Sequence, residues 1–483
     1  MASRKDLVEA HAFNRRRLVT AFVSGAPGGR EVEPARPSRT VVGGIALSVL
    51  LLAGAAVAGA LTQRPTVDWD RPGLLTDDRG ALYVILDEAR AQGHEQLRPV
   101  ANATSARLVL GADVTTTKVP DDVLADRRKG PSIGILDAPP TVPAADHLLN
   151  TGWVACTADG KGVQAEVRPT RSVQVTPDLG FVVRGVPSGQ RYLVAQASVP
   201  GHPVRAYAYR APDRDGLYAD LRLDASNEVR VPDAWLDLFP AGGALTASGL
   251  GLQGWGEPVD LPGYSRARVG DFHERSGQHY AVSRDGFVLL SDFALAVLRN
   301  TPVGGGLPRA VRAVGGERDF RTAARTYDAR WPEDLLRDGA AQRTDTLCGV
   351  LETAEDEEPA VLLATFPPGS AMIDDVGPAQ AAVVVEPGYG AVVRSAGWDT
   401  SRSDSVHLVD DTGRSYPVAG RTELENLGYG RVPPVVVPSA WLGLLTPGPE
   451  LSQSAALCPP RASSPGSSPG SSPGSSASGA ACP

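Results

Sequence analysis

The sequence predicts a single-pass membrane anchor followed by an α+β, β-rich extracytoplasmic region, in which about four small αβ repeat domains surround a central β domain. Three observations predict this fold class. Residues 40–61 form a stretch of 22 amino acids without a charge. The phrase Val-Pro-x-Ala-Trp-Leu occurs at 231–236 and again at 437–442, 206 residues later. Glycine (53 residues) and proline (41 residues) are abundant, which is typical of a chain with many turns.

The uncharged segment 40–61 is long enough to cross a membrane. As an α-helix it would span about 33 Å, which matches a hydrocarbon core of about 30 Å. The alternative is a cleaved signal peptide, because the small residues AVAGA at 56–60 resemble a cleavage site. A polar leader of 39 residues that contains acidic side chains favours a retained anchor.

Charge is distributed unevenly on the two sides of this segment. Residues 1–39 carry eight basic and four acidic side chains, whereas the rest of the chain carries 39 basic and 51 acidic ones. Because basic flanks of an anchor stay in the cytoplasm, we expect a cell-membrane protein with a cytoplasmic N-terminus and an extracytoplasmic bulk. The acidic bulk argues against a nucleic-acid partner.

The leader 1–39 carries the pattern of one short helix. Apolar residues recur at loosely helical spacing between residues 7 and 23. The basic side chains that would suit anionic lipid or an acidic partner domain are Arg15, Arg16 and Arg17. The alternative is a solvated flank that only sets the topology of the anchor.

The two Val-Pro phrases belong to longer blocks that repeat in order. Each phrase follows Val-rich runs that are typical of strands, and each block begins with a cysteine, in GWVACTADG at 152–160 and TLCGVLETAEDEE at 346–358. Weaker copies occur at 81–130 and 277–298. The matching segments follow one another in the same order in each block, while the number of residues between them varies. This is expected when strands and helices repeat and loops differ in length. We expect Trp235 and Trp441 to pack within their own repeats, with contact between subunits as the alternative.

These blocks predict the following domain boundaries. The expected parts are a basic leader (1–39), a transmembrane helix (40–61), a first repeat (62–150), a first part of the central β domain (151–200), a second repeat (201–275), a third repeat (276–340), a second part of the central domain (341–400), a fourth repeat (401–455) and a flexible Ser/Pro/Gly-rich tail (456–483).

The four cysteines all follow the predicted anchor, on the side where disulfides persist. Cys156 and Cys348 occupy equivalent places in the two blocks. A bond between them would close a long loop, which in the chain-entropy model stabilises the fold by about 5 kcal/mol. The alternative is two separate buried thiols. Cys458 and Cys482 flank the tail, and they can pair with each other or with another chain.

Motifs for catalysis or metal binding fail on inspection. Gly160-Lys161 is followed by Gly162 where a P-loop needs a hydroxyl, and HERSGQH at 273–279 lacks the spacing of a zinc-binding helix. GSSPG at 466–470 lies in the repetitive tail, and no Cys-x-x-Cys occurs. The acidic run EDEE at 355–358 is typical of a solvated loop. We therefore predict no catalytic, cofactor-binding or metal-binding residue and no cofactor.

The leader MASRKDLVEAHAFNRRRLVTAFVSGAPG, the single anchor, the paired cysteines and the repeats together resemble EccB, the bitopic core subunit of the type VII (ESX) secretion system of actinobacteria. The resemblance runs from Met1 to about residue 455 and does not include the Ser-Pro-Gly tail. It implies a central β domain with four repeat domains that resemble peptidoglycan-binding folds, and a disulfide between Cys156 and Cys348.

The resemblance also implies partners and a function. Members assemble with the motor ATPase EccC, the channel-forming EccD, EccE and a mycosin protease; their outer domains associate, and the basic leader contacts neighbours. The chain is therefore expected to be a non-catalytic structural subunit needed for protein export across the cytoplasmic membrane. One alternative is an ATP-hydrolysing secretion subunit, because members are sometimes described as ATPases; another is a cell-wall-binding module.

Overall fold

The structure is a computed structural model that describes residues 4–24, 69–91, 93–176, 179–303, 305–314, 320–335, 346–366 and 376–460. The chain divides into two compact units, Met1–Val67 and Asp68–Pro483. The predicted anchor 40–61 and Cys482 lie outside the described residues. No helix within the described ranges has both the length and the apolar character needed to cross a membrane.

The described part of the first unit is a single helix. Helix α1 (Arg4–Ser24) has 21 residues. Its side chains from Val8 to Val19 are exposed, except for the half-buried Ala12.

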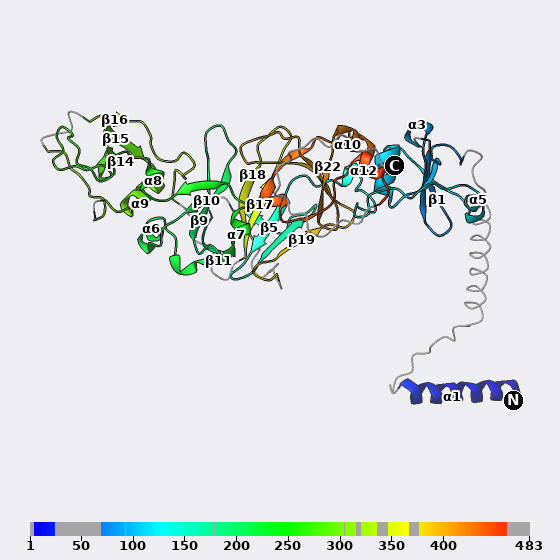
Figure 1. The fold of residues 1–483 in the computed structure, drawn as a ribbon. Helices are drawn as coiled ribbons and strands as arrows, with labels where there is room; N and C mark the ends of the chain where they lie inside the picture. The colour runs from blue at the N-terminus through cyan, green and yellow to red at the C-terminus, as the bar shows by residue number, and fades with distance from the viewer. Residues whose placement is uncertain are drawn as a thin grey trace. The chain divides into compact units, whose positions relative to one another are not determined.

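The second unit has at its centre a six-stranded sheet in the order β19-β6-β5-β17-β18-β7 (Figure 1). Its strands are β5 (Trp153–Thr157), β6 (Val163–Val167), β7 (Gln174–Val175), β17 (Leu347–Glu352), β18 (Ala360–Thr365) and β19 (Ala381–Val385). Both cysteine-headed segments contribute to this sheet. Strand β7 of the first segment pairs with β18 of the second, and β19 of the second pairs with β6 of the first. The two segments are thus interleaved and do not form two adjacent halves.

Two five-stranded sheets have the same order of corresponding strands, β11-β8-β9-β10-β12 and β23-β20-β21-β22-β24. We number the four smaller sheets first to fourth by their order in the chain. The second sheet comprises β8 (Gly180–Val186), β9 (Arg191–Ala197), β10 (Arg205–Arg210), β11 (Val229–Pro232) and β12 (Ala241–Ala244), with α6 (Asp215–Asp220), η2 (Ala225–Asn227), α7 (Asp233–Leu236) and α8 (Ala247–Leu250). The fourth comprises β20 (Ala391–Ala396), β21 (Val406–Val409), β22 (Arg414–Val418), β23 (Val435–Pro438) and β24 (Thr446–Pro447), with α10 (Arg421–Leu427), α11 (Ser439–Leu442) and α12 (Gln453–Ala456). In both, the strand that carries Val-Pro runs parallel to the first strand of the sheet.

Two smaller sheets complete the second unit, in the orders β3-β2-β1-β4 and β13-β14-β15-β16. The first sheet comprises β1 (Gly73–Thr76), β2 (Leu82–Ile85), β3 (Leu97–Pro99) and β4 (Thr116–Lys118), with α3 (Glu88–Ala91), α4 (Ala103–Leu110), α5 (Asp121–Ala125) and η1 (Ala145–His147) after it. The third comprises β13 (Phe272–Arg275), β14 (Gln278–Ser283), β15 (Gly286–Leu290) and β16 (Thr322–Ala323), with α9 (Asp292–Arg299). Ser291 caps α9 by accepting a hydrogen bond from Ala294 N at 3.1 Å.

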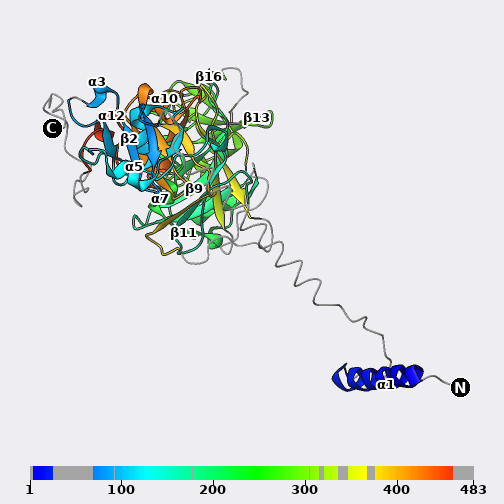
Figure 2. The same ribbon diagram turned by 90° about the vertical axis from the view of Figure 1, so that its right-hand side faces the viewer.

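The sheets share three main hydrophobic cores. The largest joins the central sheet to the second and fourth sheets. Another joins the second sheet to α9 and the third sheet, and another joins the fourth sheet to α4 and the first sheet. Helices α10 and α12 of the fourth sheet both pack against α4, and Figure 2 looks at this end of the second unit. Each small sheet therefore buries its apolar face against a neighbour, as expected for units too small to enclose a core alone.

Two expected boundaries are wrong. Strands β8 and β9 lie within 151–200, the first expected part of the central domain, but they pair in the second sheet. Strand β20 lies within 341–400 but pairs in the fourth sheet. Val-rich strands look alike whichever sheet they join, and long-range pairing decides the choice.

Candidate functional site

The first part of the candidate site is a disulfide at the middle of the central sheet. Cys156 of β5 and Cys348 of β17 are directly opposed in the antiparallel register. The structure joins them in a disulfide with a Cα–Cα distance of 4.1 Å, and both residues are fully buried. No described cysteine is a free thiol. The bond spans 192 residues and so encloses the whole of the second and third sheets.

The two faces of β5 explain why the disulfide is inaccessible. Alternate side chains of a strand point to opposite faces of the sheet. Trp153 and Ala155 lie in the largest core, while Val154 and Cys156 lie in a smaller core on the other face. The central sheet is thus covered on both sides, and the disulfide is shielded from solvent.

Trp235 connects the first Val-Pro phrase to the central sheet. It follows β11, where Pro232 in an extended conformation precedes the short helix α7. The indole Nε1 donates to the carbonyl of Ala155, the neighbour of Cys156, at 3.2 Å. The ring of Phe239 packs against the indole edge, with centroids 4.8 Å apart. The first phrase is therefore attached beside the disulfide.

Trp441 of the second phrase contacts the first phrase. Its Nε1 donates to the carbonyl of Leu238 at 3.1 Å, and its side chain is almost fully buried in the same large core. The expectation that each tryptophan packs within its own repeat is therefore wrong for Trp441, whereas Trp235 packs against Phe239 of its own repeat and also contacts the central sheet. A helix of four residues is too short to enclose an indole, so both side chains occupy the space between sheets.

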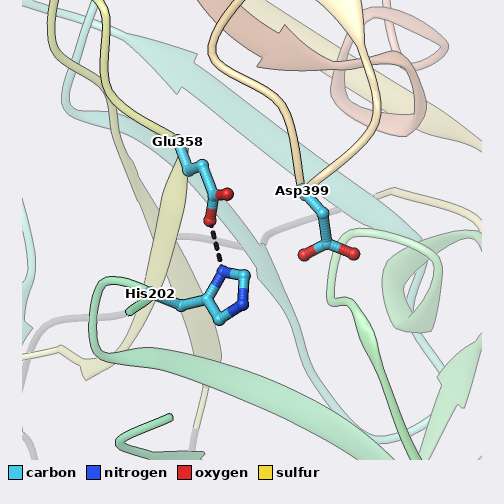
Figure 3. A group of neighbouring side chains, drawn as sticks. All are labelled: His202, Glu358 and Asp399. Atoms are coloured by element: carbon cyan, nitrogen blue, oxygen red, sulfur yellow. Dashed lines mark hydrogen bonds and ion pairs between the residues drawn. The ribbon is translucent and has the colours of Figure 1, made fainter. Parts of the chain in front are cut away.

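The second part of the candidate site is a polar junction of His202, Arg205, Glu358 and Asp399. Figure 3 shows three of these side chains, His202, Glu358 and Asp399. The four residues come from the β9–β10 loop, the start of β10, the β17–β18 turn and the β20–β21 loop. They thus connect the second, central and fourth sheets. Glu358 is the last residue of the acidic run that the sequence analysis interpreted as a solvated loop, and this interpretation is wrong for Glu358.

Arg205 organises the polar junction. Its side chain is 1% exposed, and Nη2 lies 2.7 Å from Glu358 Oε2. Nη1 donates to the carbonyl of Trp398 at 2.8 Å and lies 3.5 Å from Asp399 Oδ1. Glu358 Oε2 is also 2.7 Å from His202 Nδ1. One buried guanidinium therefore ties three loops together.

The polar junction contains residue types that can bind a metal ion, but the guanidinium of Arg205 supplies the positive charge there. Ligand atoms of His202, Glu358 and Asp399 lie within 4.8 Å of one another. However, the guanidinium of Arg205 already supplies the positive charge that pairs with both carboxylates. A divalent cation would be repelled by this buried charge. The donor set therefore forms an ion-pair network, and it does not fit a metal centre.

The charges around Glu358 lower the pKa of its carboxyl. Partial burial acts in the opposite direction, but the hydrogen bond and charge of His202 and the charge of Arg205 together outweigh it. A carboxyl with a lowered folded-state pKa stabilises the fold above its unfolded value of 4.5, and this contribution is lost as the pH falls through the folded pKa.

Glu358→Gln should therefore destabilise the second unit at neutral pH by about 1 kcal/mol, because it weakens charged hydrogen bonds that are partly solvated. The difference from the wild type should shrink as the pH falls below 4.5 and vanish once the pH is below the lowered folded-state pKa of Glu358. Thermal unfolding at several pH values measures it. The matched control is Glu357→Gln at the exposed neighbouring position, for which we expect no such pH-dependent difference. A constant difference across the pH range would contradict the assigned role of the Glu358 charge.

The predicted arginine triplet belongs to the first unit. Arg15, Arg16 and Arg17 are exposed on α1 in the first unit. The disulfide and the polar junction lie in the second unit. No motif surrounds Arg205 or His202, so sequence patterns alone do not indicate either residue.

The two tryptophans and the polar junction share one property, namely that each connects separate sheets. The disulfide joins the two cysteine-headed segments within the central sheet. Fold and site together define a multi-sheet scaffold protein. The chain belongs to the family described as "Type VII secretion system ESX-1, transport TM domain B", the EccB family, whose model matches residues 1–460.

Relatives and solved structures agree with this assignment. The chain is 29% identical to "ESX-1 secretion system ATPase EccB1" of Mycolicibacterium smegmatis over 454 residues, 87% of each chain. It is 27% identical to "ESX-3 secretion system ATPase EccB3" of Mycobacterium tuberculosis, over 88% of this chain and 84% of the relative. Its fold resembles a chain in an intact ESX-5 inner membrane complex, with a TM-score of 0.58, 22% identity and 98% coverage of both chains. It also resembles the EccB3 dimer of the ESX-3 core complex, with a TM-score of 0.55, 21% identity and coverage of 80% of this chain and 99% of that chain.

Proposed function

We propose that this chain is a non-catalytic structural subunit of a type VII (ESX) secretion membrane complex, needed for protein export across the cytoplasmic membrane. The observation that carries the proposal is the match to the EccB family model over residues 1–460. The scaffold character of the second unit supports it, because the polar junction connects three sheets and the disulfide joins two strands of the central sheet.

The proposed topology has the leader in the cytoplasm, residues 40–61 as a single transmembrane helix, and the second unit outside. The distribution of basic and acidic residues supports this orientation. The disulfide Cys156–Cys348 supports it too, because disulfides persist in an oxidising exterior.

We also propose that the four smaller sheets are copies of one repeat domain arranged around the central sheet. The shared strand order of the second and fourth sheets supports this for two of them. In the first sheet, β1 pairs with β2 and with the parallel β4, in the same positions as β8 with β9 and β11. In the third, β15 pairs with the parallel β16, as β10 does with β12.

The proposed partners are further ESX subunits and a second copy of this chain. A similar chain occurs in an ESX-5 inner membrane complex, and another is described as a dimer in an ESX-3 core complex. By resemblance to the family, the other partners would be EccC, EccD, EccE and a mycosin protease. The exposed Arg15, Arg16 and Arg17 are available for contacts on the cytoplasmic side.

Deletion of the gene should abolish export of the substrates of this secretion system, and the full chain supplied in trans should restore it. The amounts of substrate in culture filtrate and cell pellet measure the effect. A cytoplasmic marker protein in the filtrate controls for lysis. Export at the wild-type level in a clean deletion strain would overturn the proposed function.

The relatives named above are described as ATPases, so nucleotide turnover needs its own test. The Gly160-Lys161 pair lies in the tight turn between the antiparallel strands β5 and β6. A P-loop instead joins a strand to a helix whose first amides bind phosphate.

Lys161→Ala should therefore leave export unchanged, because this lysine contacts no nucleotide in the proposed mechanism. Complementation of the deletion strain with this variant measures the effect. Phosphate release by the purified chain that disappears in the Lys161→Ala variant would show instead that the turn has a catalytic role.

A further inference from the structure

Cys458 is the third cysteine of the chain that takes part in a disulfide. It is disulfide-bonded, and none of the described cysteines is a free thiol. Cys156 and Cys348 are already joined to each other, and a sulfur in a disulfide has one sulfur partner. The chain has four cysteines, so Cys482 is the one residue of this chain that remains as a partner for Cys458.

The fold fixes Cys458 where the first and fourth sheets meet. Helix α12 precedes it, and Ser452 caps this helix by accepting a hydrogen bond from Ala455 N at 3.2 Å. Ala456 is fully buried in the core that joins the first and fourth sheets. The carbonyl of Cys458 accepts a hydrogen bond from Gly134 N at 3.0 Å. The residue at which the Ser-Pro-Gly tail begins is therefore held in place by both sheets.

We infer that Cys458 and Cys482 form a second disulfide, which closes the Ser-Pro-Gly tail into a loop and which a thiol in solution can open while the chain stays folded. Cys156 and Cys348 are fully buried, whereas Cys458 is partly exposed. The rate of thiol–disulfide exchange depends on access to the sulfur that is attacked. The two disulfides of the chain therefore differ in their response to reductant.

The length and composition of the tail favour pairing within one chain over pairing between chains. Twenty-three residues, 459–481, separate the two cysteines, and all of them are Pro, Arg, Ala, Ser or Gly. A flexible segment of this length has an end-to-end distance of roughly 25–30 Å. The effective concentration of one end around the other is then on the order of millimolar. A cysteine of a second chain at about micromolar concentration would compete about 1000-fold less well.

Formation of the bond needs an oxidant, and this step rests on the proposed topology, in which the tail lies outside the cytoplasmic membrane. The oxidant is a disulfide-bearing molecule of that compartment. The thiolate of one cysteine attacks its disulfide, so that a mixed disulfide forms and one thiol leaves. The thiolate of the other cysteine then attacks the cysteine sulfur of the mixed disulfide, and the second thiol leaves. The oxidant thus takes up the two electrons and the two protons that the cysteines lose.

Digestion with trypsin tests the pairing, because Arg461 lies between the two cysteines. Free thiols of the full chain are blocked with iodoacetamide, and the denatured chain is digested without reductant. We expect mass spectrometry to find the fragments 432–461 and 462–483 linked, and to find them separate after reduction. A separate fragment 462–483 in the sample without reductant would overturn the inference. So would a non-reducing gel that shows two chains crosslinked through Cys458 or Cys482.

Treatment of the folded full chain with dithiothreitol tests the access of a thiol to the second bond. We expect a gain of two alkylated thiols per chain, at Cys458 and Cys482, while Cys156 and Cys348 react only after denaturation. The matched variant is Cys482→Ser, which should have one reactive thiol at Cys458 without any reductant. The variant with both Cys458→Ser and Cys482→Ser should have none. A Cys482→Ser variant without a reactive thiol at Cys458 would contradict the pairing.

The buried disulfide separates the failure of this inference from the failure of the proposed topology. Alkylation of intact cells, followed by the same digestion, measures the state of both pairs. If all four cysteines are reduced, the proposed topology is wrong, and the inference that rests on it fails too. If Cys156 and Cys348 are joined while Cys458 and Cys482 are free thiols, only the inference is wrong. Two linked pairs are the result that we expect.

Discussion

Loss of the Cys156–Cys348 bond should lower the free energy of unfolding of the second unit by about 5 kcal/mol. The bond closes a loop of 192 residues. The entropy that a crosslink removes from the unfolded chain grows with the length of the closed loop, so the effect is large here. Guanidinium unfolding of the purified second unit, followed by tryptophan fluorescence, measures the change. Because cooperativity differs among domains, the transition midpoint is the quantity to compare.

The variants Cys156→Ala, Cys348→Ala and the double variant should be equally destabilised, since each one breaks the same bond. Reduction of the wild-type chain under denaturing conditions, followed by refolding in reductant, should give the same midpoint as the double variant. A double variant with the wild-type midpoint would contradict a structural role for the disulfide. Additive losses in the two single variants would show that the cysteines act through packing.

Trp441→Ala should destabilise the second unit by about 4 kcal/mol, because it opens a cavity in the core that joins the central, second and fourth sheets. Trp441→Phe retains most of the apolar contact and removes the hydrogen bond to Leu238, so it should cost about 1 kcal/mol. Chemical unfolding of the two variants measures both effects.

The matched control is Trp69→Ala, because Trp69 is only partly buried and lies outside the largest core. We expect it to cost less than Trp441→Ala. Equal losses at the two positions would contradict the role of Trp441 as a connection between sheets. If Trp441→Phe is as unstable as Trp441→Ala, the effect depends on the shape of the indole and not on its apolar volume.

Much of the fold could be predicted from local patterns. Val-Pro followed by Ala-Trp-Leu indicates a strand that leads into a helical turn, and the structure has β11 with α7 and β23 with α11 at these positions. Proline at the start of a helix and valine in a strand are favoured by their own backbone preferences. Such features require no knowledge of distant residues.

Sheet membership and the polar junction could not be predicted because they depend on distant partners. Gly180–Val186 is Val-rich like the central strands, yet it pairs in another sheet. Arg205 and Glu358 are 153 residues apart, and no motif marks either of them. A buried guanidinium needs a carboxylate, but a sequence with 55 acidic residues does not indicate which one.

The central claim is that this chain is a structural subunit of a type VII secretion membrane complex, and extraction of the tagged full chain in mild detergent tests it most directly. The account predicts that the chain migrates as part of a large assembly and that mass spectrometry of this assembly identifies other subunits of the secretion system. A chain that is recovered alone, from cells in which those subunits form their complex without it, would contradict the account.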